Sequence, residues 1–218
     1  MATADVEPII QRLLEAYPNP RVALEYSNPL ELLVATILSA QCTDARVNEV
    51  TRVLFKKYRT VEDYARADLE TVEREIRSTG YYRNKARTLI RCCRALVERF
   101  GGRVPDNMEE LTSLTGVGRK TANLVLGSAF GRPGIAVDTH VLRVANRLGL
   151  VQSRNAEKVE LAIRARVPEP FWTAFSLAMI RHGREVCTAR HPRCEACVLS
   201  DLCVWPERSV RISLGQGR

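Results

Sequence analysis

The strongest structural signal in this chain is the segment Leu114-Thr115-Gly116-Val117-Gly118-Arg119-Lys120-Thr121-Ala122. Two glycines two residues apart predict a tight turn, and the residues after them begin a helix. Unpaired N–H groups and the positive end of the helix dipole make such a helix start a binding site for phosphate. We therefore expect a helix–hairpin–helix, made of helices over 109–114 and 120–130. On its own, the turn is also compatible with a purely structural helix–helix connection.

Lys120 falls in the first turn of the second hairpin helix. The positive helix end, together with partial burial, is expected to favour its neutral amine, which is a nucleophile. A lysine that only contacts phosphate would satisfy the same pattern. Downstream, Val137-Asp138-Thr139-His140 places Asp138 where it can cap a helix over 139–148. A phosphate site beside a nucleophile suggests chemistry on nucleic acid.

Composition is consistent with this interpretation. The 218 residues are 45% hydrophobic, enough for a real core, and the net charge is +8 with an isoelectric point near 9.4. A basic balance favours a polyanionic partner, although it also serves solubility alone. The N-terminus lacks the pattern of a secretory signal, and the longest apolar run, 32–40, is too short to cross a bilayer. We expect a cytoplasmic protein with no membrane partner.

Apolar residues recur with the helical period along most of the chain, and no segment shows the alternation of a strand. The sequence therefore predicts an all-α fold. The segment 30–40 is almost wholly apolar and should form the buried centre of a helical bundle. The tail 209–218 is expected to be mobile. The remaining predicted helices cover 6–17, 44–58, 60–65, 69–78, 82–100, 156–166 and 170–184.

The chain has seven cysteines, an odd number without a secretory signal, which argues against a disulfide framework. Four of them crowd together near the C-terminus in the spacing C-x6-C-x2-C-x5-C. Four thiolates brought together by a compact loop suit a tetrahedral zinc ion or an iron–sulfur cluster, and the spacing alone does not decide between them. The other three are interpreted as inert core thiols. The four candidate ligands are Cys187, Cys194, Cys197 and Cys203.

Three arginines lie in or beside the cysteine segment: Arg184, Arg190 and Arg193. They could face a phosphate backbone, or they could form a solvated basic loop.

Together these motifs resemble the endonuclease III family of base-excision-repair enzymes. The resemblance rests on Leu38-Ser39-Ala40-Gln41-Cys42-Thr43-Asp44, the hairpin with Lys120, the segment 137–140 and the cysteine spacing. It implies two helical lobes with a DNA groove between them. Residues 22–132 would form a six-helix barrel domain. Residues 1–21 and 133–218 would form a discontinuous domain, with a [4Fe-4S] cluster on the four cysteines of loop 187–203.

The resemblance also implies an activity. The chain would be a bifunctional DNA glycosylase and AP lyase that removes oxidised pyrimidines from double-stranded DNA and also acts on abasic sites. Lys120 would attack the sugar of a flipped-out nucleotide and form a Schiff base, and β-elimination would nick the strand. Asp138 would assist deprotonation of the lysine and stabilise positive charge on the sugar, besides capping its helix. A monomer associated with the nucleoid is expected.

Two further positions follow from the family pattern. Base flipping leaves a gap in the duplex, and Gln41 matches the position that enters it. Tyr81, after Thr79-Gly80, stands where the family often has leucine; it could wedge between bases or be an ordinary exposed aromatic residue. In the hairpin, Thr115 replaces a common proline. The amides of Gly116, Val117 and Gly118 would hold a phosphate.

Other functions remain open at this stage. The adenine-mismatch branch generally lacks the lysine and carries an additional C-terminal domain, so Lys120 and the end of the sequence at Arg218 argue against it. A lysine-bearing 8-oxoguanine branch generally lacks the cysteines. A catalytically silent DNA-binding module would not need both Lys120 and Asp138. An electron carrier has no use for the nucleophile.

Overall fold

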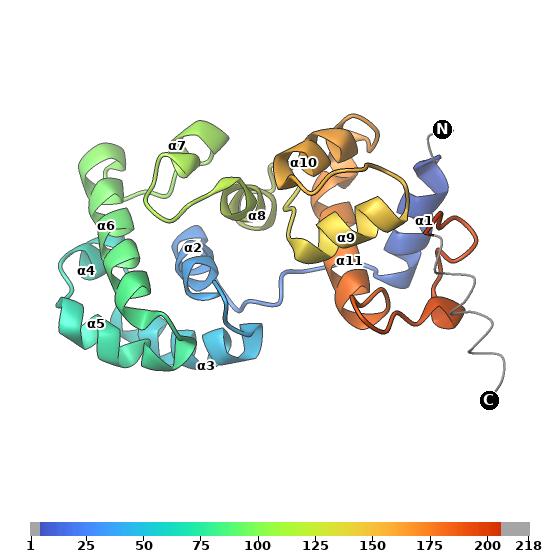
Figure 1. Cartoon of the computed structure of the whole chain (residues 1–218). Helices are drawn as coiled ribbons and strands as arrows, with labels where there is room; N and C mark the ends of the chain where they lie inside the picture. The colour runs from blue at the N-terminus through green and yellow to red at the C-terminus, as the bar shows by residue number, and fades with distance from the viewer. Residues whose placement is uncertain (1–4, 206–218) are drawn as a thin grey trace. The chain divides into compact units, whose positions relative to one another are not determined.

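The computed structural model describes residues 5–205, and every regular element in this range is helical, which confirms the all-α prediction. The α-helices in chain order are α1 Glu7–Ala16, α2 Pro29–Leu38, α3 Asp44–Lys57, α4 Val61–Ala65, α5 Leu69–Glu75, α6 Tyr82–Phe100, α7 Met108–Thr112, α8 Arg119–Ala129, α9 Thr139–Arg147, α10 Ala156–Arg164 and α11 Trp172–Glu185 (Figure 1). Short 3₁₀ turns follow at η1 Arg77–Thr79, η2 Glu169–Phe171 and η3 Cys194–Ala196. The tail 209–218 lies outside the described residues.

The chain divides into two compact units. Unit 1 consists of residues 1–21 and 133–218, and unit 2 consists of residues 22–132. Seven α-helices, α2 to α8, belong to unit 2, where the family resemblance led us to expect six; α4 and α7 have only five residues each.

Helix α2 is the centre of unit 2 and packs against α3, α6 and α8 (Figure 1). Every residue from Leu32 to Leu38 is buried. The helix begins at Pro29, one residue before the predicted segment, because the Asn28 side chain caps it and Pro29 suits its first turn. An all-round apolar helix is stable only when neighbours cover it on every side, which explains its central position.

The start of α6 adjoins a loop with unusual backbone angles. Helix α5 ends one turn earlier than expected and continues as η1, after which Gly80 and Tyr81 both have positive φ, 70° and 48°. Helix α6 then runs over the predicted range and packs on α4 and α5.

Unit 1 is built around α11, which packs on α1 and α9. The core joins the N-terminal helix to the C-terminal half of the chain through buried residues such as Ile9, Leu13, Val141 and Phe175. Gly183 lets α9 and α11 approach closely, because a Cβ there would lie 2.8 Å from that of His140. Among residues 5–205, no helix has the length and apolar character needed to span a membrane.

Candidate active site and iron–sulfur loop

The hairpin turn is held against α6. Gly116 has φ of +83°, and a Cβ at this position would lie 2.2 Å from the methyl group of Thr88. Only glycine satisfies both conditions. Gly118 differs, because a Cβ there would meet nothing within 4 Å.

Helix α8 begins at Arg119 without a side-chain cap, since its N-cap residue is Gly118. Neither Gly116 nor Gly118 donates its amide to another described residue. The start of α8 thus offers exposed N–H groups and the positive end of an 11-residue helix, an arrangement suited to an anion.

Val117 departs from the expectation that all three turn amides point outward. Its amide donates to the carbonyl of Leu114 at 3.1 Å, and its side chain is buried in the core of unit 2. Val117 therefore anchors the turn from inside, which leaves the two glycine amides for a ligand.

Lys120 is the second residue of α8, as the sequence predicts, and its side chain is exposed. The partial burial expected for Lys120 is therefore not seen in the structure.

Asp138 is partly buried and caps α9. The preceding residues Ile135 to Val137 are buried in the core of unit 1, so the backbone that carries Asp138 is well anchored. Its Oδ1 accepts from the amides of His140 at 2.8 Å and Val141 at 2.9 Å. Oδ2 makes no hydrogen bond with any described residue, so one oxygen fixes the carboxylate and the other is available for chemistry.

Gln41 and Tyr81 share an unusual backbone conformation. Only three non-glycine residues in the described range have positive φ, and these are two of them, at 52° and 48°. Both side chains are exposed, Tyr81 by 70%. Such strain persists only where the surrounding structure imposes it, and it clusters at functional sites.

All four candidate cysteine ligands line one pocket, together with Arg147, Pro192 and Trp205. The cysteines are free thiols within one loop, which is anchored to the core by the fully buried Leu199. Burial raises the pKa of Cys197 to about 11. Because a metal ligand must be a thiolate, occupation of this pocket releases protons.

Four thiols that line one pocket can provide the four points of attachment of a [4Fe-4S] cluster, and the same donor set suits a zinc ion.

Two arginines of α9, which the sequence analysis missed, hold the cysteine loop. Arg147 donates to the carbonyls of Thr188 at 2.8 Å and Ala189 at 3.1 Å, and it approaches Cys187 Sγ at 3.2 Å. Arg143 donates to the carbonyl of Cys187 at 3.0 Å. Their spacing of four residues places both side chains on one face of the helix, and this spacing could have indicated a shared role from the sequence.

A buried histidine also contacts the loop. His182 Nε2 lies 3.4 Å from Cys197 Sγ, and Tyr17 Oη lies 3.2 Å from its Nδ1. Burial lowers the pKa of His182 to about 4. Nothing in the sequence marked this residue, because its neighbours come from distant segments.

The three arginines predicted near the cysteines, Arg184, Arg190 and Arg193, are all exposed. Arg193 also donates to the carbonyl of Glu185, so part of its guanidinium helps to shape the loop.

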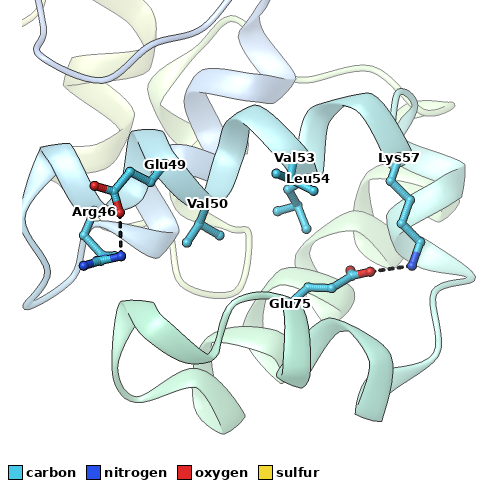
Figure 2. A pocket seen from close by; sticks show the side chains of 7 residues that line it. All are labelled: Arg46, Glu49, Val50, Val53, Leu54, Lys57 and Glu75. Atoms are coloured by element: carbon cyan, nitrogen blue, oxygen red, sulfur yellow. Dashed lines mark hydrogen bonds and ion pairs between the residues drawn. The ribbon is translucent and has the colours of Figure 1, made fainter.

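A pocket in unit 2 lies apart from every predicted site residue. It is lined by α3 and by Glu75 of α5, with Val50 and Leu54 between the ion pairs Arg46–Glu49 and Lys57–Glu75 (Figure 2).

Comparison with known proteins shows which family this chain resembles. Residues 34–169 match the family model of the HhH-GPD superfamily base excision DNA repair protein, and residues 187–203 match the iron-sulfur binding domain of endonuclease III. Endonuclease III of Synechocystis sp. is 48% identical over 196 residues, which cover 89% of this chain and 90% of that protein. Endonuclease III of Escherichia coli (strain K12) is 44% identical over 200 residues, which cover 92% of this chain and 95% of that protein.

Solved structures of DNA repair enzymes are also similar to this chain. A trapped endonuclease III–DNA covalent intermediate matches with a TM-score of 0.91 and 43% identity, covering 97% of this chain and 99% of that one. A thermostable thymine-DNA glycosylase matches with a TM-score of 0.82 and 27% identity, and the match covers 92% of this chain and 95% of that one. The exposed lysine at the hairpin, the capping aspartate and the cysteine loop therefore stand in a chain that belongs to the endonuclease III family of HhH-GPD base excision DNA repair proteins.

Proposed function

We propose that Lys120 and Asp138 carry out the base removal and strand cleavage of a bifunctional DNA glycosylase and AP lyase. This type of activity follows from the family. The observation that carries the assignment is the exposed Lys120 at the uncapped start of α8, beside the amides of Gly116 and Gly118. A related enzyme has been trapped as a covalent intermediate with DNA, which is the species that an amine nucleophile forms.

The reaction begins when the neutral amine of Lys120 attacks C1′ of a flipped-out nucleotide. The bond from C1′ to the base breaks, and the base leaves with the bonding electrons and takes up a proton. The sugar ring then opens to a Schiff base between C1′ and the lysine nitrogen. Loss of a proton from C2′ expels the 3′ phosphate and nicks the strand.

Asp138 assists in two ways. Its Oδ2, which makes no hydrogen bond among the described residues, takes a proton from the lysine and stabilises the positive charge that builds on the sugar. Its Oδ1 holds the carboxylate in place through the two amides of α9, so that little reorganisation is needed during the reaction.

Gly116 and Gly118 bind a backbone phosphate near the lesion. Gln41 and Tyr81 fill the gap that the flipped nucleotide leaves, and their exposure and imposed backbone conformation support this role. The exposed Arg184, Arg190 and Arg193 add phosphate contacts. The preferred substrate is duplex DNA with an oxidised pyrimidine or an abasic site.

The chain's cofactor is a [4Fe-4S] cluster, and we assign Cys187, Cys194, Cys197 and Cys203 as its ligands. When bound, the cluster joins the four thiolates and fixes the fold of the loop. Arg147 and Arg143 then hold the loop to the helix that begins at Asp138.

We further propose that the protein acts as a monomer on chromosomal DNA, in the cytoplasm and associated with the nucleoid. Sedimentation of the protein at micromolar concentration should give one species near the mass of a single chain.

The decisive experiment uses duplex DNA with one oxidised pyrimidine in the presence of borohydride, which reduces the Schiff base to a stable amine. A covalent protein–DNA adduct is expected with the wild type and not with Lys120→Ala. Lys158→Ala is the matched control, because Lys158 is also exposed near the start of a helix.

An unchanged adduct with Lys120→Ala would refute the assignment of the nucleophile. No adduct with the wild type would indicate a monofunctional glycosylase or a silent DNA-binding protein.

A further inference from the structure

Lys85 is a buried lysine that no catalytic step described above uses. It belongs to the first turns of α6 and is only 5% exposed. Lysine is almost never buried without a partner, because removing an ammonium group from water is costly. Burial accordingly lowers the pKa of Lys85. Its Nζ donates a hydrogen bond to the carbonyl of Thr79 at 2.7 Å, and among the described residues it has no carboxylate partner.

The Thr79 carbonyl is the start of the turn that carries Tyr81. The two residues that follow it, Gly80 and Tyr81, both have positive φ. For a tyrosine this conformation costs about 1–2 kcal/mol, so it has to be held by its surroundings. The carbonyl of Tyr81 accepts the first hydrogen bond of α6, from the backbone amide of residue 85 at 3.1 Å, and the Lys85 side chain holds the other end of the turn at the Thr79 carbonyl.

We propose that Lys85 is a positioning residue that holds the turn carrying Tyr81 in the conformation from which Tyr81 fills the gap left by a flipped nucleotide. The proposal rests on the gap-filling role given to Tyr81 above. Lys85 itself is buried and touches no DNA; it acts through the Thr79 carbonyl. A flexible turn would present Tyr81 in many orientations, and ordering it on binding would cost free energy.

The test compares two substrates, since only one of them has a gap to fill. Base excision is measured on duplex DNA with one oxidised pyrimidine, and β-elimination is measured on a single-stranded abasic oligonucleotide. Lys85→Met, Tyr81→Ala and the double variant are compared with the wild type. Arg94→Met is the matched control, because Arg94 also belongs to α6 and donates to a backbone carbonyl outside this helix, that of Ala65 at the end of α4, at 3.0 Å.

We expect Lys85→Met to lower the duplex rate relative to the single-strand rate by about tenfold, the order of one base-stacking contact. The double variant should be no worse than Tyr81→Ala, since both changes remove the same contribution. Hydrogen exchange of the amides of residues 79–82 should become faster in Lys85→Met but not in Arg94→Met. If Lys85→Met does not fold, Lys85→Gln is measured in the same way.

The possible failures are distinct. A loss of the duplex rate in Tyr81→Ala without any loss in the Lys85 variants overturns the role of Lys85 and leaves the gap-filling assignment intact. Equal losses on both substrates in Lys85→Met also overturn it, because they indicate a general structural defect. No effect of Tyr81→Ala overturns the gap-filling assignment and the Lys85 proposal with it.

Discussion

Asp138 combines a structural and a chemical role in one side chain. Capping α9 occupies only Oδ1, through the amides of His140 and Val141. Asparagine caps a helix about as well as aspartate does but carries no charge, whereas alanine neither caps the helix nor carries a charge. The two roles can therefore be separated by substitution.

We expect Asp138→Asn to slow base release by at least about 100-fold, because it removes the charge that assists Lys120. Its free energy of unfolding and its DNA affinity should stay close to those of the wild type. Asp138→Ala should lose about 1 kcal/mol of stability in addition. Single-turnover kinetics, denaturant unfolding and DNA titration give the three quantities. A fall in DNA affinity comparable to the fall in rate would make the role of Asp138 structural.

The two hairpin glycines should respond differently to alanine. Gly116→Ala forces a methyl group onto Thr88 at a left-handed position, so we expect the free energy of unfolding to fall by about 2 kcal/mol. Gly118→Ala meets open space, so stability should hold while DNA affinity falls, because the methyl group intrudes where a phosphate binds. Thermal unfolding and DNA titration distinguish the two. Equal loss of stability in both variants would contradict this account.

At the level of single helices, α9 connects the proposed catalytic aspartate with the cysteine loop. Asp138 caps its start, and Arg143 and Arg147 along its length bind the carbonyls of Cys187 and Thr188. Arg147 also stacks on Trp205, with its guanidinium carbon 4.0 Å from the ring centroid. The loop is thus held to this helix by the protein's own hydrogen bonds.

We expect Arg147→Met to lose iron to a chelator about ten times faster than the wild type, because the contacts that orient the cysteine loop are removed. Release of iron and acid-labile sulfide over time gives the rates. Arg154→Met, an exposed position in the same unit, is the control and should behave as the wild type does. Equal rates in all three proteins would mean that the loop does not depend on Arg147.

At the level of the whole molecule, two separate hydrophobic cores stand out. The core of unit 2 is formed by residues between 24 and 126, and that of unit 1 by residues of the two flanking segments. Leu199 of the candidate iron–sulfur loop belongs to the core of unit 1, and no residue of the loop belongs to the core of unit 2.

Removal of iron from the holoprotein should therefore affect unit 1 and spare unit 2. We expect faster hydrogen exchange in the cysteine loop and in α9, while α2 and α6 keep their protection, because their core contains no residue of the loop. Hydrogen-exchange mass spectrometry before and after chelation measures this. Loss of protection in α2 would show that the two cores unfold together.

Much of the fold could be predicted because local signals were strong. The largely apolar segment around Leu33 indicated a central helix, and the predicted cap at Asp138 marked the observed start of α9. The hairpin, with Gly116, Gly118 and Lys120 in order, was equally local. By contrast, the burial of Lys120 was predicted wrongly, and Val117 uses its amide internally, because both depend on neighbours that the local pattern does not specify.

The helical class, the hairpin, the cysteine motif and the family could be predicted from the amino-acid sequence, since these depend on periodicity and on residues close together in the chain. The groups that surround these features became known from the folded structure. It brought Arg147 and His182 to the cysteines and Thr88 to Gly116, and it buried Lys85 beneath the turn of Tyr81. These contacts join segments far apart in sequence, and they arise from the packing of whole helices, which no local pattern encodes.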